Sequence, residues 1–199
     1  EVDIPSYMQY EHNSLNIGKV VADENPQMEV HNKKGYGLAV KKQWSDLSLT
    51  TGHDSIYTAV FINEGGQMRL LDGSVKRIQS PSTSADYFWT TLEPYQNGTE
   101  RTSMEDYVVR EVTLSNHDPT VAADGTVTNY GTVTPLDSGD SINLTATRTA
   151  DATPAGENPD KAYDYVVSYD TGTQSGTTRT DTITNTREDV GTNSDLWRG

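Results

Sequence analysis

Apolar and polar residues alternate along much of the chain, which is the pattern of half-buried β-strands. The clearest alternating runs span residues 38–44, 56–62, 87–92, 107–111, 163–169 and 182–185. No run shows the three- and four-residue apolar spacing of an amphipathic helix. Turn-forming pairs such as Gly65-Gly66 and Asp72-Gly73 separate the runs. Many short strands separated by turns in this way predict an all-β fold, an Ig-like β-sandwich.

Composition and charge limit the kinds of partner that the protein is expected to bind. Only 33% of the 199 residues are hydrophobic, although 11 Tyr, 3 Trp and 2 Phe are available to build a core. The formal net charge is -14. This charge argues against nucleic acid as a partner, because nucleic-acid binding needs a basic surface. It argues against an anionic membrane surface for the same reason.

Residue types that carry common site chemistry are scarce. The chain has no cysteine, which excludes disulfides, thiolate metal sites and cysteine nucleophiles. The four histidines, at 12, 31, 53 and 117, do not have the spacing of metal ligands. We therefore expect neither a metal nor a cofactor. A secreted domain without disulfides needs another source of stability, such as a different kind of crosslink.

Three polar residues fall at positions where the alternation predicts a buried side chain. Lys42 shares a strand face with Leu38 and Trp44, Glu111 follows the apolar positions of its run, and Asn185 follows Ile183. A lone Lys or Glu in the core costs several kcal/mol unless it is paired or neutralised. Each of the three residues could end its strand in solvent, but together they suggest a shared buried site.

Four segments, in order, resemble the B-type domain of Gram-positive collagen adhesins and pilins, the Cna B-type fold. The opening segment, 40–46, has a lysine two residues before a tryptophan and an acidic turn after it. The other segments are 88–98, with aromatic, Leu, Pro, Tyr and Gly in order, 107–111 around an acid, and 183–186 around an asparagine. The resemblance covers about residues 37–188.

The resemblance implies an intramolecular isopeptide bond between Lys42 and Asn185, with Glu111 as the catalytic acid that polarises the amide and shuttles protons. Such a bond forms once and releases ammonia, so the protein would not be a turnover enzyme. The neighbouring Lys41 is the competing nucleophile. It falls on the opposite strand face, and we expect it to lie in solvent.

The domain boundaries follow from the same segments. Residues 37–188 are predicted to form the Cna B-type domain, and residues 189–199 a C-terminal linker or tail. The stretch from Glu111 to Asn185 is longer than the family usually shows, so we predict an inserted hairpin or subdomain at about 118–160 that the rest of the domain can fold without. Residues 1–36 are either the tail of a preceding repeat or an arm that packs on the main domain.

The resemblance implies a structural stalk or spacer module of an extracellular, cell-wall-anchored adhesin or pilin, with neighbouring domains of the same surface protein as partners. One alternative is an adhesin module that uses the insertion to bind a host extracellular ligand. Exposed aromatics on the insertion would favour it; Tyr130, Tyr163, Tyr165 and Tyr169 are available, but we expect the last three to pack in the core. A second alternative is an accessory domain of a secreted carbohydrate-active enzyme, which a pair of carboxylates would support.

Overall fold

The computed structural model describes residues 8–12, 30–80, 87–92, 95–96, 99–100 and 103–190. These residues form β-strands and turns, with one short 3-10 helix, η1 (Glu188–Val190). The predicted all-β class is therefore confirmed. Within the described residues, no helix has the length and apolar character needed to cross a membrane.

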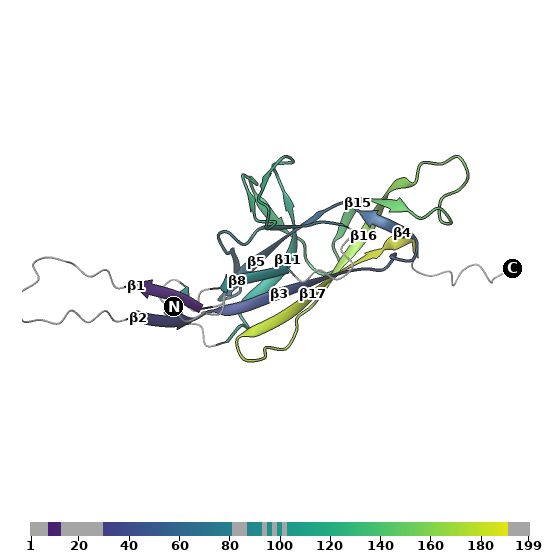
Figure 1. Ribbon diagram of the computed structural model, residues 1–199. Helices are drawn as coiled ribbons and strands as arrows, with labels where there is room; N and C mark the ends of the chain where they lie inside the picture. The colour runs from purple at the N-terminus through teal and green to yellow at the C-terminus, as the bar shows by residue number, and fades with distance from the viewer. Residues whose placement is uncertain are drawn as a thin grey trace, which may run out of the picture.

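Most strands belong to two larger sheets (Figure 1). The strands are β1 (Met8–His12), β2 (Val30–Lys34), β3 (Tyr36–Trp44), β4 (Thr50–His53), β5 (Ile56–Glu64), β6 (Gln67–Leu70), β7 (Lys76–Ile78), β8 (Tyr87–Leu92), β9 (Tyr95–Gln96), β10 (Thr99–Glu100), β11 (Tyr107–Leu114), β12 (Thr120–Val121), β13 (Val127–Thr128), β14 (Val133–Pro135), β15 (Ser141–Arg148), β16 (Asp160–Asp170) and β17 (Thr178–Arg187).

The larger sheet has six strands in the order β4-β15-β16-β17-β3-β8. Strands β3 and β17 pair in parallel, whereas the other neighbours in this sheet are antiparallel. In the parallel register Lys42 lies opposite Ile183, and Trp44 lies opposite Asn185. The first long strand and the last strand are therefore direct neighbours in the interior of the sheet (Figure 1).

The second sheet has the order β14-β11-β5-β6, with β7 also paired to β5. The main hydrophobic core includes residues of both sheets, among them Leu38, Ile62, Tyr107, Tyr165 and Ile183. Each of these residues sits at an alternate position of its strand, so the period of two seen in the sequence directs one face of each sheet into this core.

The segment predicted as an insertion, 118–160, divides into two parts. Residues 141–148 form β15, which lies between β4 and β16 in the six-stranded sheet and contributes Leu144 and Ala146 to the main core. The strands β12 and β13 pair only with each other, and Val127 joins a second apolar cluster on β5 and β11. Deleting 118–160 would remove β15 from the six-stranded sheet and β14 from the other sheet, so the expectation that the rest folds without this segment is not supported.

The aromatic residues proposed for ligand binding pack against the protein. Tyr163 and Tyr165 are buried in the main core, and Tyr169 is half-buried against it. Tyr130 is half-buried against the second cluster. Tyr163, Tyr165 and Tyr169 thus pack in or against the core as expected, and these residues do not provide the exposed aromatics that would favour the adhesin alternative.

In the N-terminal arm, β1 and β2 form their own antiparallel pair. Only Gly35 separates β2 from β3, and the pair extends from the end of the molecule at which β3 begins (Figure 1). Neither strand pairs with the two larger sheets in the described part of the chain. Residues 1–7, 13–29 and 191–199 lie outside the described residues, as do parts of the 88–98 segment.

Candidate functional site

The three polar residues singled out in the sequence meet in the core. Lys42 Nζ lies 3.8 Å from Glu111 Oε2, and Asn185 Nδ2 donates a hydrogen bond of 3.1 Å to Glu111 Oε1. Lys42 is 3% exposed, and Glu111 and Asn185 are 0% exposed. The structure thus brings all three predicted site residues together and seals them from solvent.

Strand register explains this meeting. Lys42 and Asn185 project from the same face of adjacent parallel strands, because Ile183 pairs with Lys42 and Asn185 is two residues further along β17. Glu111 approaches from β11 in the other sheet. Its backbone N–H donates to the Tyr169 hydroxyl at 3.0 Å, and that hydroxyl donates to Leu136 O at 2.7 Å. Tyr169 therefore holds the β11 backbone in place at Glu111. It was not predicted from the sequence as a site residue.

Burial pushes both ionisable groups toward their neutral forms. It lowers the pKa of Lys42 to about 7, although the charges of Glu111 and Asp46 oppose the shift. Burial also raises the pKa of Glu111, against the Lys42 charge and the Asn185 hydrogen bond. A neutral amine is nucleophilic and a protonated carboxyl can donate a hydrogen bond, so each group is shifted toward the form that amide chemistry requires.

The surroundings of the amine hold it in place. Lys42 Nζ donates to Gln43 O at 3.2 Å and lies 4.1 Å from the centroid of the Trp44 ring. Lys41, the competing nucleophile, is exposed on the opposite face of β3 as expected. Asn185 Oδ1 and Glu111 Oε2 are buried without a hydrogen-bond partner. The site therefore has unused bonding capacity at the amide and at the acid.

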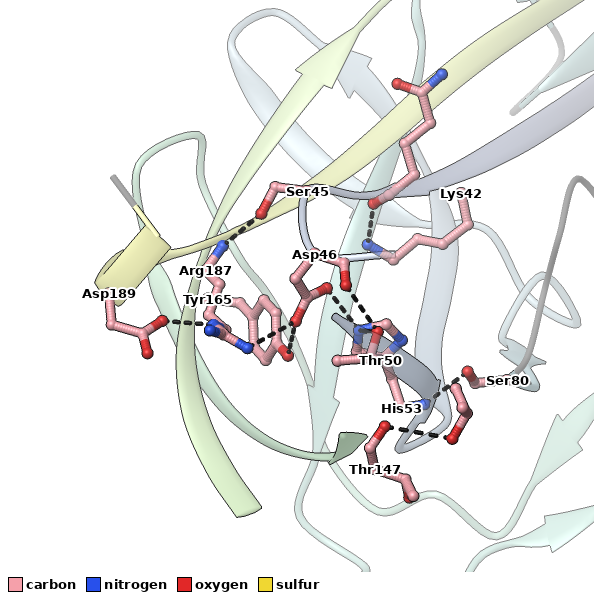
Figure 2. Close-up of polar contacts among 12 residues, drawn as sticks. Lys42, Ser45, Asp46, Thr50, His53, Ser80, Thr147, Tyr165, Arg187 and Asp189 are labelled. Atoms are coloured by element: carbon pink, nitrogen blue, oxygen red, sulfur yellow. Dashed lines mark hydrogen bonds and ion pairs between the residues drawn. The ribbon is translucent and has the colours of Figure 1, made fainter. Parts of the chain in front are cut away.

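A second buried polar cluster lies beside this site and was not anticipated from the sequence (Figure 2). The carboxylate of Asp46 accepts hydrogen bonds from His53 Nε2 at 2.7 Å and from the Tyr165 hydroxyl at 2.8 Å. Arg187 Nη1 lies 3.6 Å from Asp46 Oδ2. We call Asp46, His53, Tyr165 and Arg187 the Asp46 cluster; it ties the turn after β3 to β4, β16 and β17.

Hydrogen bonding decides the charge of Asp46. Burial alone would raise its pKa, but hydrogen bonds from His53 and Tyr165, together with electrostatic interactions with His53 and Arg187, hold the pKa below its usual value. The Trp44 ring stacks on His53 with ring centroids 3.8 Å apart and meets Tyr165 edge-on at 5.2 Å. Trp44 therefore joins the Asp46 cluster to Lys42.

The two sites have different kinds of chemistry. In the Asp46 cluster a carboxylate accepts two hydrogen bonds and faces the Arg187 guanidinium, an arrangement suited to fixing one end of the fold. The Lys42 site contains an amine and an amide that both contact the same carboxyl group, that of Glu111. No group of three or more His, Asp or Glu within the described residues is placed to hold a metal ion.

Comparison of the chain with protein-family models, with curated proteins and with solved structures finds no match. The geometry of the site therefore carries the functional argument.

Proposed function

We propose that Lys42 and Asn185 form an intramolecular isopeptide bond, with Glu111 as the acid, in an Ig-like sandwich of the Cna B type. The observation that carries this proposal is the buried contact of amine, carboxyl and amide, with hydrogen-bond and ion-pair distances of 3.1 and 3.8 Å. The four family-like segments in the sequence support it, because three of them supply these residues.

The reaction begins with transfer of a proton from the Lys42 ammonium to the Glu111 carboxylate, which removes both buried charges. A half-turn of the Asn185 amide places Oδ1 against the protonated acid, whose hydrogen bond polarises the carbonyl. Lys42 Nζ then attacks Cγ, and the Cγ–Nδ2 bond breaks. One amine proton passes to Nδ2 through Glu111, ammonia leaves, and the carboxyl remains protonated beside the new amide.

Folding supplies the positioning that this reaction needs. Holding the reacting groups in contact can remove about 7–11 kcal/mol from a barrier in well-oriented cases. Exclusion of water strengthens the hydrogen bond from Glu111 to the amide oxygen. Since Lys42 and Asn185 are consumed, the protein acts once on itself and does not turn over a substrate.

We infer a structural role, as a stalk or spacer module of an extracellular surface protein of the pilin or adhesin kind. Strand β3 begins at the end of the molecule near β1 and β2, and β17 runs parallel to it toward the opposite end (Figure 1). A tensile load applied through the two ends therefore shears β3 against β17. A covalent bond between these strands resists that shear directly.

Single-molecule stretching from the two ends tests the mechanical role. The wild-type chain should extend only outside the 42–185 segment, because the bond closes that segment into a loop. Glu111→Gln, which keeps the side-chain shape but cannot supply the proton, should show a further extension of roughly 480 Å, from about 140 residues at about 3.4 Å each. Equal extensions of the two proteins would contradict the proposed role.

A further inference from the structure

A third side chain with an unpaired polar atom lies at the same level of the core. Thr58 on β5 is the direct partner of Glu111 in the β5–β11 register. Ile56 and Val60, two residues to either side, belong to the main core, so Thr58 is on the inward face. Its side chain is 0% exposed, and its hydroxyl has no hydrogen-bond partner.

Direct partners on antiparallel strands have Cβ atoms about 4.5–5.5 Å apart, which puts the Thr58 hydroxyl within reach of the Glu111 carboxyl. Glu111 and the two residues that adjoin it, Thr58 by strand register and Asn185 by a hydrogen bond, thus each have one buried polar atom without a partner: Glu111 Oε2, Thr58 Oγ1 and Asn185 Oδ1. A buried polar atom without a partner destabilises the fold, and native cores contain few such atoms. Three unpaired polar atoms on adjoining residues indicate a set of groups that form hydrogen bonds with one another during a reaction.

We propose that Thr58 is a positioning residue for formation of the isopeptide bond, its hydroxyl donating a hydrogen bond to Glu111 Oε2. This inference rests on the proposed function. A carboxyl oxygen that accepts a hydrogen bond is the one that lacks the proton. Once the Asn185 amide has made its half-turn, Oε1 no longer accepts from Nδ2, and the bond from Thr58 to Oε2 places the acid proton on Oε1, the oxygen that faces Asn185.

No other described group fills this role. Lys42 Nζ is 3.8 Å from Oε2, too far for a good hydrogen bond, and it loses a donor proton when it becomes the nucleophile. Asn185 Nδ2 contacts Oε1 instead. A hydroxyl has one donor and two acceptor positions and rotates freely, so Thr58 can follow the carboxyl as its protonation changes.

Thr58→Val and Thr58→Ser test the inference. Valine has the shape of threonine without the hydroxyl, whereas serine keeps the hydroxyl. Each protein is made by cell-free synthesis, samples are quenched in acid at set times, and the fraction that has lost ammonia is measured by intact mass. We expect bond formation to slow at least about tenfold in Thr58→Val and to stay within about twofold of wild type in Thr58→Ser.

Stability measurements separate a positioning role from a packing role. In the Glu111→Gln background, where no bond forms, Thr58→Val should be as stable as its parent or more stable, because it replaces an unpaired hydroxyl with a methyl group. If Thr58→Val destabilises the fold, Thr58→Ala serves as a second hydroxyl-free variant, and it too should react slowly.

The outcomes are distinct. Wild-type bond formation in both hydroxyl-free variants overturns the role of Thr58 and leaves the proposed function intact. Equal slowing in Thr58→Ser and Thr58→Val also overturns it, since the hydroxyl would then not matter. A wild-type chain that never loses ammonia refutes the proposed function itself, before any variant is compared.

Discussion

Glu111→Gln should lower the free energy of unfolding by about 5 kcal/mol relative to wild type. The variant cannot form the bond, and the bond closes a loop of about 140 residues; by analogy with disulfides, a crosslink over such a loop contributes about 5 kcal/mol through the unfolded chain. Glutamine keeps the packing volume of the fully buried Glu111, so little of the loss should come from a cavity. Denaturant unfolding followed by circular dichroism measures the difference.

Lys41→Met is the matched control, because Lys41 precedes the nucleophile in β3 but is exposed. Its unfolding free energy should stay within about 0.5 kcal/mol of wild type. A Glu111→Gln protein as stable as wild type would contradict a crosslink between β3 and β17.

Asp46→Asn should cost about 3 kcal/mol, the lower end of the range for breaking a buried ion pair. The change removes the charge that His53 and Arg187 face and weakens the acceptor of the Tyr165 hydroxyl. The measurement is best made in the Glu111→Gln background, where unfolding is not masked by the crosslink. Asp151→Asn is the control, because Asp151 is exposed on a loop and should change stability by less than about 0.5 kcal/mol.

The Asp46 cluster also predicts a dependence on pH. Because the folded protein lowers the pKa of Asp46, the unfolded chain takes up this proton first as the pH falls. Its contribution to stability is complete above the ordinary Asp pKa of about 4 and is lost as the pH falls through the lower folded value. Asp46→Asn should therefore lose less stability than its parent on acidification below pH 4. Parallel curves for the two proteins would show that Asp46 is not held in its charged form.

The alternation of apolar and polar residues was sufficient to predict the all-β class and to single out Lys42, Glu111 and Asn185 as polar residues at inward positions; their assignment to one site came from the family resemblance. A period of two fixes which side chains share a face, and Lys42, Glu111 and Asn185 each occupy an inward position beside large apolar neighbours. The pairing of β3 with β17 was accessible only through the family resemblance, because strand phase says nothing about which strands are neighbours.

Strand β15 and the Asp46 cluster were not predicted from the sequence. β15 contributes Leu144 and Ala146 to the core, and polar residues surround them in its sequence. The hydrophobicity of this strand is therefore low. Asp46 and Tyr165 are 119 residues apart in the chain, and only the folded sheet brings them together. Thr58 gave no signal at all, since threonine is common in strands and its unpaired hydroxyl is visible only once the register is known.

Intact-mass measurement with peptide mapping tests the Lys42–Asn185 bond most directly. The wild-type chain should weigh one ammonia less than its sequence mass, and digestion should yield a single branched product that joins the Lys42 and Asn185 peptides. Glu111→Ala and Lys42→Ala should restore the full mass, whereas Lys41→Ala should not. A wild-type chain with its full sequence mass, and with separate Lys42 and Asn185 peptides after digestion, would contradict the bond and the stalk role built on it.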